Sequence, residues 1–137
     1  MLDFMDLQVG DSLPAFTTAP VSRLTLALYC GASGDHNPMH VDIDFAHQAG
    51  APDVFAHGML SMAYLSRLLT NWVPQQYLRE YGVRFTAITH VGDAITCSGT
   101  VTELFEVLGE TRARLSLQTV NQHGRVLLAG DAVVALG

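Results

Sequence analysis

Apolar residues in the first half of the chain recur at helical spacing. Ser22 can cap a helix expected over residues 23–32, whose apolar positions lie mostly on one side. A second, short helix is expected over residues 45–49. The longest helical candidate covers residues 58–73, is apolar on more than one face, and ends before Pro74. A helix of that kind is largely buried, so we expect it to lie at the centre of the fold.

The second half of the chain alternates between polar and apolar residues and is rich in aromatic and β-branched side chains, which favours strands. Four strands are expected, over residues 77–89, 94–108, 111–120 and 125–136. An earlier extended piece over residues 13–18 is interrupted by Pro14 and stopped by Pro20. A buried helix followed by a run of antiparallel strands predicts an α+β fold in which the sheet wraps around the helix.

The composition indicates one domain, residues 1–137, with enough apolar residues (49%) for a core. Only 15% of the residues are charged, which is low for a soluble protein. This favours a surface that is partly covered by another subunit, although a compact domain with few surface charges would look the same. Because the edge of the sheet must be covered or paired, we expect a homodimer, or a higher homo-oligomer built from dimers.

The charge pattern argues against two classes of partner. The net charge is −6 and every basic residue is an arginine, so there is no basic stripe to bind nucleic acid. Local arginines such as Arg84 could still meet an anionic ligand, although an ion pair within the protein is favoured. No signal peptide is expected in residues 1–4, and no apolar run is long enough to span a membrane. Cys30 and Cys97 match no metal or redox motif, which favours reduced thiols in the cytoplasm.

Residues 34–40 read Gly-Asp-His-Asn-Pro-Met-His and carry the candidate chemistry. Pro38 cannot lie inside a helix and pushes Asn37 toward a turn. Asp35 and His40 are therefore expected to flank a tight turn that aims both side chains into one pocket, where an acid and an imidazole could move protons on a substrate. The alternative is a turn aspartate that bonds its own backbone beside a partly buried histidine. From the spacing alone this alternative is favoured.

Gly58, at the start of the central helix, supplies the second candidate feature. The first amides of a helix have no internal partner and carry partial positive charge. A glycine lets a ligand approach that backbone closely, so a carbonyl oxygen bound there would be polarised. Alone, Gly58 is more simply explained as a tight helix start. Together with Asp35 and His40, it offers a proton-transferring pair and an oxyanion site on one small domain.

Competing chemistries are less well supported. His36 and His40 are four residues apart, but Pro38 between them argues against a helical metal site, and neither HExxH nor CxxC occurs, so no metal is expected. No G-x-S-x-G sequence supports a serine hydrolase. Ser66 should either bond back to its own helix or orient a carboxylate in a pocket. The other histidines are expected at the surface or in turns: His47, His90 and His123.

Three segments give the chain a resemblance to a known family: residues 33–40, residues 56–60, and residues 83–87 followed by Gly92-Asp93. In order and spacing they resemble the R-specific enoyl-CoA hydratases and 3-hydroxyacyl-thioester dehydratases of the MaoC-like group, which have the hotdog fold. The resemblance spans nearly the whole chain. The third segment departs from the pattern, because many members have a proline near Ile88 or Val91, and this affects the shape of the strand.

The resemblance implies roles for individual residues. Asp35 and His40 would activate and share the catalytic water, and the Gly58 amide would bind the thioester carbonyl. Asn37 would hold the turn. Ser66 matches a position that contacts the catalytic aspartate in some members of the family.

The resemblance also implies a reaction, the hydration of trans-2-enoyl-CoA to (3R)-3-hydroxyacyl-CoA. Residues 58–86 are similar to 3-hydroxyacyl-ACP dehydratases of fatty-acid synthesis as well, and residues alone do not fix the direction. The implied partners are an acyl-CoA or an acyl carrier protein, and no cofactor beyond that carrier is expected. A hotdog thioesterase and a non-catalytic acyl-thioester-binding subunit are further alternatives, but the presence of both Asp35 and His40 favours the hydratase.

Overall fold

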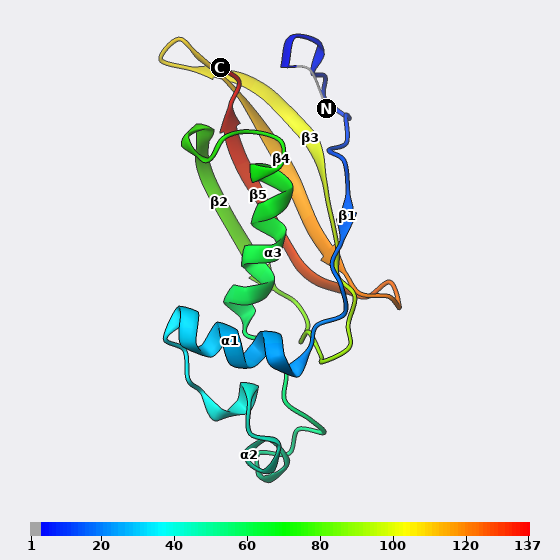
Figure 1. Ribbon diagram of the computed structural model, residues 1–137. Helices are drawn as coiled ribbons and strands as arrows, with labels where there is room; N and C mark the ends of the chain where they lie inside the picture. The colour runs from blue at the N-terminus through cyan, green and yellow to red at the C-terminus, as the bar shows by residue number, and fades with distance from the viewer. Residues whose placement is uncertain (1–3) are drawn as a thin grey trace.

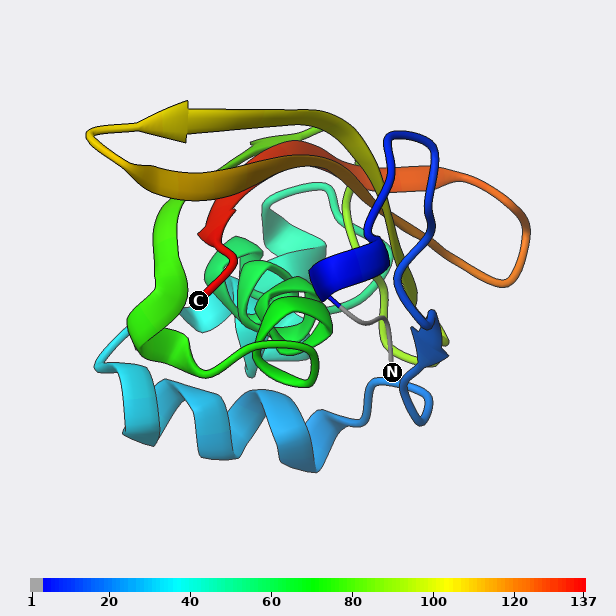
Figure 2. The same ribbon diagram turned by 90° about the horizontal axis from the view of Figure 1, so that it is seen from above.

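The helix α3 (Gly58–Thr70) is the axis of the fold, and an antiparallel sheet curves around it (Figures 1 and 2). A computed structural model describes residues 4–137. Its other helices are α1 (Arg23–Ser33), α2 (Ile43–Gln48) and 3-10 turns at Phe4–Asp6, Pro38–His40 and Gln75–Tyr77. Its strands are β1 (Phe16–Thr17), β2 (Leu78–Phe85), β3 (Thr96–Val107), β4 (Glu110–Val120) and β5 (Val126–Ala135).

The five strands lie in the order β1-β3-β4-β5-β2, and every neighbouring pair is antiparallel. Two hairpins join β3 to β4 and β4 to β5, while β2 pairs only with β5 and forms one edge of the sheet. Alternate residues of β4 face the helix and are buried: Ala113, Leu115, Leu117 and Thr119. The predicted α+β architecture, with a sheet around a buried helix, is confirmed.

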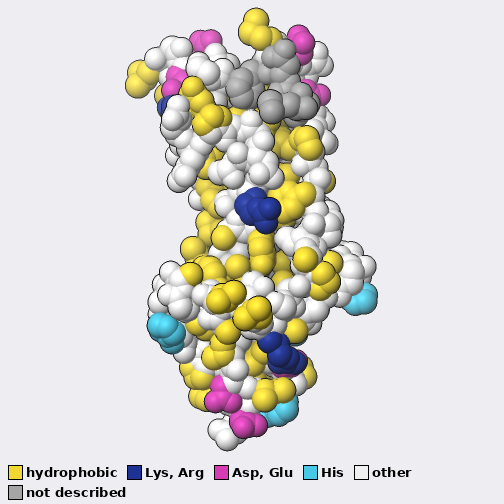
Figure 3. Space-filling model, in the orientation of Figure 1, with side chains coloured by type: hydrophobic (Ala, Val, Ile, Leu, Met, Phe, Trp, Pro, Cys, Tyr) yellow, Lys and Arg dark blue, Asp and Glu magenta, His cyan; other side chains and the backbone are white. Residues whose placement is uncertain are grey.

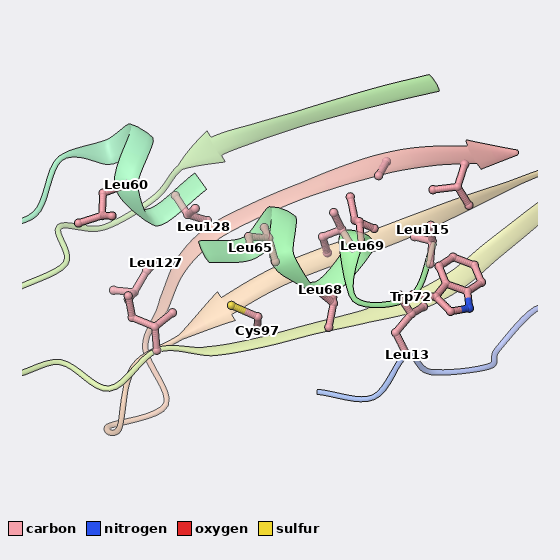
Figure 4. Packing of buried hydrophobic residues seen from close by; sticks show 14 of the residues in the cluster. Leu13, Leu60, Leu65, Leu68, Leu69, Trp72, Cys97, Leu115, Leu127 and Leu128 are labelled. Carbon is pink, nitrogen blue, oxygen red and sulfur yellow. The ribbon is translucent and has the colours of Figure 1, made fainter. Parts of the chain in front are cut away.

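The core lies between α3 and the concave face of the sheet. Figure 4 shows side chains of both layers meeting there, among them Leu65, Leu68 and Leu69 from α3 and Cys97, Leu115 and Leu128 from the sheet. All of them are almost completely buried. Burying a leucine of this kind stabilises a fold by roughly 1.5–3 kcal/mol, so this layer fixes where α3 begins and ends relative to the sheet.

The N-terminal segment differs from its prediction. The strand expected over residues 13–18 shrinks to β1, because Pro14 and Pro20 cannot donate backbone hydrogen bonds to a ladder. The segment still covers the outer edge of β3 through separate bonds, including Leu13 N to Gly99 O at 3.0 Å and Thr18 N to Ile95 O at 2.9 Å.

The central helix ends three residues earlier than predicted. After Thr70, the chain continues in turns in which the amides of Trp72 and Val73 both donate to the carbonyl of Leu69. Trp72 and Val73 remain buried, so the apolar pattern continues beyond the last helical residue. The apolar pattern therefore shows which residues are buried, but it does not show where the helix ends.

The two short helices place the turn between them at the N-terminal end of α3 (Figure 1). Ser22 caps α1 by accepting a hydrogen bond from the Thr25 amide at 3.1 Å, as predicted. Asp42 caps α2 through the amides of Asp44 and Phe45. Among residues 4–137, no helix combines the length and the apolar content that crossing a membrane requires. Charged side chains are sparse on the face shown in Figure 3, as the composition leads one to expect.

Candidate active site

Successive side chain-to-backbone hydrogen bonds build the corner between α1 and α2. Gly34 ends α1 in the left-handed conformation with φ +78°, which glycine adopts without strain. Asp35 Oδ1 then accepts from the Asn37 amide at 3.2 Å, and Asn37 Oδ1 accepts from the Met39 amide at 3.1 Å. Both are Asx-type turns, which the short polar side chains of Asp and Asn favour. The tight turn predicted around Pro38 is confirmed, and Asn37 lies where it can hold that turn.

This corner brings Asp35 and His40 together. The distance from Asp35 Oδ2 to His40 Nε2 is 4.0 Å. That is too long for a direct hydrogen bond but short enough for one water to bond to both atoms. The two environments differ, because the side chain of Asp35 is 51% exposed and that of His40 only 9%. The pair therefore has one solvent-facing member and one buried member.

Phe55 fixes the protonation pattern of the His40 ring. His40 Nδ1 lies 2.7 Å from the Phe55 carbonyl oxygen, which can only accept, so Nδ1 donates this bond. In the neutral ring, Nε2 then carries the lone pair and faces the Asp35 carboxylate. A histidine held in this tautomer can take a proton from a water at Nε2 and return it.

His57 is a site residue that the sequence analysis did not identify. Its side chain is 1% exposed, and its ring stacks on that of His40 with centroids 3.8 Å apart and an angle of 24°. Tyr29 contacts the same ring edge-on at 4.7 Å. Burial lowers the pKa of His57, and the neighbouring His40 lowers it further. The only signal in the sequence was a histidine directly before the glycine of a helix start.

Gly58 is the first residue of α3, and its neighbour His57 makes no side-chain cap. The amides of Leu60 and Ser61 donate to the His57 carbonyl, whereas the Gly58 amide meets no acceptor within the described part of the chain. A Cβ at this position would lie 2.9 Å from Phe85 Cε1, so a side chain here would require the Phe85 ring to move. A cavity of about 150 Å³, lined by residues that include Gly58, Phe85 and Ile88, adjoins this amide. The predicted oxyanion position is therefore sterically open.

Ser66 lies two turns further along α3. Its hydroxyl donates to the Ala63 carbonyl at 2.6 Å, which is the bond back to its own helix. Ser66 lines a surface groove together with Tyr29, Met59 and Tyr81. Among residues 4–137, no hydrogen bond joins Ser66 to Asp35. The structure brings Asp35 and His40 together, connects both to Gly58 through contacts with its neighbour His57, and leaves Ser66 further along the helix.

Asp35, His40 and His57 offer three ligand atoms within 4.8 Å of one another, which raises the question of a metal ion. The stacked rings of the two histidines argue against one, because their in-plane lone pairs run side by side and do not converge on one point. The donor set therefore does not fit the tetrahedral geometry of zinc. His36 is exposed and takes no part in the cluster.

Other residues of interest lie outside the cluster. No carboxylate lies within 4.0 Å of Arg84 among residues 4–137, so the ion pair favoured from the sequence is not seen there. Cys30 and Cys97 are both free and buried, and burial raises the pKa of Cys97 to about 11. The remaining histidines are exposed, as predicted: His47, His90 and His123.

Known proteins resemble this chain in fold and in sequence. An (R)-hydratase from A. caviae involved in PHA biosynthesis matches with a TM-score of 0.85 and 28% identity, over 96% of this chain and 98% of that one. The protein is thus a hotdog-fold domain in which Asp35 and His40 come together at the corner between α1 and α2. It belongs to the MaoC-like domain family, whose model matches residues 6–121.

Two curated relatives show the range of activities in this family. An (R)-specific enoyl-CoA hydratase of Rhodospirillum rubrum is 31% identical over 134 residues, covering 96% of this chain and 89% of the relative. A mitochondrial 3-hydroxyacyl-[acyl-carrier-protein] dehydratase of Arabidopsis thaliana is 27% identical over 131 residues, covering 95% of this chain and 78% of the relative.

Proposed function

We propose that this protein is an (R)-specific enoyl-CoA hydratase, which adds water to a trans-2-enoyl-CoA and forms a (3R)-3-hydroxyacyl-CoA. One observation carries the proposal: Asp35 Oδ2 and His40 Nε2 lie 4.0 Å apart, at a corner that contacts His57, the residue directly before Gly58. The likeness to the R. rubrum hydratase supports it independently. Asp35, His40 and Gly58 are the residues to which we assign the reaction, with Asn37 as support for the turn and Ser66 as a residue of the adjoining groove.

The Gly58 amide would prepare the substrate. When it donates to the thioester carbonyl oxygen, it draws electron density away from C3 and makes that carbon electrophilic. The water between Asp35 and His40 then attacks C3, a C–O bond forms, and the π electrons of the C2=C3 bond move toward C2 and the carbonyl oxygen. Since the charge on that oxygen grows as the bond forms, the amide binds the transition state more strongly than the substrate.

The protons balance within the pair. The attacking water gives one proton to His40 Nε2 or to Asp35, and C2 takes one proton from the same pair, so the elements of one water molecule are added and the pair is restored. The bond from His40 Nδ1 to the Phe55 carbonyl keeps the ring oriented and stabilises its charged form. The chemistry we propose needs no cofactor beyond the carrier of the acyl thioester.

Dehydration of a (3R)-hydroxyacyl-ACP is the second candidate, favoured by the likeness to the A. thaliana dehydratase. Both directions pass through one transition state, so the same residues serve either. Comparing turnover of the CoA and acyl-carrier-protein thioesters, in each direction, decides between the two substrates.

We also propose that the protein forms a homodimer through β2. This strand pairs with β5 on one side and forms the edge of the sheet on the other. The low content of charged residues supports burial of part of the surface. Light scattering coupled to size exclusion should give twice the monomer mass, and a monomer mass at micromolar concentration would contradict the proposal. Buried, unpaired Cys30 and Cys97 agree with the reducing cytoplasm, which we propose as the compartment.

The assignment is tested with Asp35→Asn and His40→Ala in crotonyl-CoA hydration, followed by the loss of enoyl-thioester absorbance. We expect each change to lower kcat by about a hundredfold or more, as for a lost acid–base group, with an unchanged circular dichroism spectrum. His36→Ala is the matched control, because His36 lies in the same turn but is exposed. Normal hydration by either variant contradicts the assignment. Release of free thiol by the wild type would instead indicate a thioesterase, and no reaction at all a binding subunit.

A further inference from the structure

His57 touches both members of the proton-transferring pair. Its ring lies against the His40 ring, with the centroids 3.8 Å apart. Its Nε2 lies 3.2 Å from the main-chain carbonyl oxygen of Asp35. It directly precedes Gly58, so one buried imidazole adjoins the carboxylate corner, the catalytic imidazole and the oxyanion position at once.

The neighbours of His57 define which nitrogen holds its proton. Nε2 faces the Asp35 carbonyl, which can only accept, and the Cys30 Sγ at 3.4 Å, which can accept weakly. Nε2 must therefore carry hydrogen. Nδ1 is buried and has no hydrogen-bond partner within the described residues, so it carries the lone pair. In the opposite tautomer, the lone pair of Nε2 would face the Asp35 carbonyl oxygen, and Nδ1 would carry a buried N–H without an acceptor.

The same contacts keep the ring neutral. A proton added at Nδ1 would create a buried N–H without an acceptor, on a charged ring stacked against His40. The titratable groups in contact with His57 are Asp35 and His40 from the turn, and Tyr29 and Cys30 from α1. Asp35 is the only carboxylic acid among them; it bonds His57 through its main-chain carbonyl and raises the pKa of His57, but burial and His40 outweigh it and keep that pKa below its ordinary value.

We infer that His57 is a positioning residue for the hydration reaction: a neutral, Nε2-protonated imidazole that holds the Asp35 corner by a hydrogen bond and the His40 ring by stacking. The inference rests on the proposed hydratase function. His57 exchanges no proton with the substrate. Its neutrality matters because His40 gains charge during turnover, and a second charge on the stacked ring would oppose that step.

Three single substitutions separate the hydrogen bond of His57 from its ring stacking. His57→Gln places an amide nitrogen near the Nε2 position and keeps the hydrogen bond without the aromatic ring. His57→Phe keeps the stacked ring without the donor, and His57→Leu removes both. The side chain of His57 makes no helix cap, so none of these changes removes one. His47→Gln is the matched control, since His47 Nε2 also lies 3.0 Å from a backbone carbonyl, that of Pro52, but at an exposed position.

We expect His57→Leu to lower kcat by about ten- to hundredfold, because small misplacements of reacting groups have effects of this size, with KM changed less than about threefold. His57→Gln and His57→Phe should each lower kcat by less than His57→Leu does, and His47→Gln should leave kcat unchanged. If His57→Leu does not fold, the other two variants still decide the matter. Wild-type kcat in the folded His57 variants, or a loss of stability without a loss of kcat, would overturn the inference.

An independent readout is the ¹⁵N NMR spectrum of the histidine rings in the wild type. His57 should remain a neutral Nε2–H tautomer to a lower pH than a free imidazole, whose pKa is about 6.5, because burial and the neighbouring His40 lower its pKa. A His57 imidazolium at pH 6.5, or the Nδ1–H tautomer, overturns the inference. Absence of wild-type turnover would instead refute the proposed function, and the role of His57 in catalysis with it, so the two failures are distinguishable.

Discussion

Adding one methyl group at Gly58 probes the oxyanion position most directly. The Cβ of Gly58→Ala would lie 2.9 Å from Phe85 Cε1 and 3.2 Å from Phe85 Cδ1. The first contact is closer than carbon atoms tolerate and the second is tight, so the phenyl ring must move. Phe85 is 55% exposed and can swing aside without disturbing the core. The ring is also a wall of the cavity of about 150 Å³ beside the amide, so its movement changes the space in which the thioester would lie.

The effect on stability should be small. Overpacking costs about 1–3 kcal/mol, while replacing glycine by alanine in a helix regains up to about 1 kcal/mol. A net loss of at most about 3 kcal/mol leaves a domain of ordinary stability folded. The effect on catalysis should be larger, because loss of one oxyanion contact costs about a hundred- to a thousandfold. We expect kcat/KM for crotonyl-CoA to fall by about a hundredfold in Gly58→Ala.

A double-mutant cycle with Phe85→Ala identifies the cause. Removal of the ring gives the new methyl group room, so the double variant Gly58→Ala/Phe85→Ala should recover most of the activity that Gly58→Ala loses relative to its parent. The two residues are in contact, and contacting residues show non-additive effects. Multiplicative losses in the double variant would refute a clash through Phe85. Wild-type kcat/KM in Gly58→Ala would refute the placement of the carbonyl at this amide.

Three further variants test the fold around the site. A Cβ at Gly130 would lie 2.1 Å from the Gly82 carbonyl oxygen. Gly130→Ala should therefore lower the free energy of unfolding in urea by about 3 kcal/mol or more. A Cβ at Gly82 would meet open space, so Gly82→Ala should change that free energy by less than about 1 kcal/mol. Arg79 and Arg112 hold the pKa of Glu110 at about 2. This carboxylate therefore stabilises the fold above its unfolded pKa of about 4.3, and the deficit of Glu110→Gln should vanish as the pH falls toward 2. Equal losses for both glycine variants, or a pH-independent deficit, would contradict these two arguments.

The parts of the structure that could be predicted depend on neighbouring residues in the sequence. The caps at Ser22 and Asp42, and the turn around Pro38, follow from hydrogen bonds and dihedral preferences spanning a few positions. These local rules indicated a turn that could bring Asp35 and His40 together, but the spacing alone favoured a turn aspartate bonded to its own backbone. The structure shows both features, because Asp35 Oδ1 accepts from the Asn37 amide while Oδ2 faces His40. The open amide at the start of α3 was also predictable, because every helix leaves its first amides unpaired.

The parts that were missed depend on distant contacts. His57 is buried because α1 and the turn, more than 16 residues earlier in the chain, pack over it, and no spacing rule reports such packing. Trp72 and Val73 kept the apolar pattern because they enter the core after the helix has ended. The ion pair favoured for Arg84 depended on which carboxylates the fold would bring near, and that is set by the register of the sheet.

The two edges of the sheet differ in a way that limits how it can grow. One edge, along β3 up to Val101, is sealed by the N-terminal segment with its two prolines, while the opposite edge, β2, keeps eight residues available for pairing. Pairing of β2 with its copy about a two-fold axis would use up the open β2 edge of both molecules and leave outside the β3 edges, which are sealed up to Val101. Strand addition would then stop at two chains, and the asymmetry of the sheet would protect the protein from forming open-ended fibres.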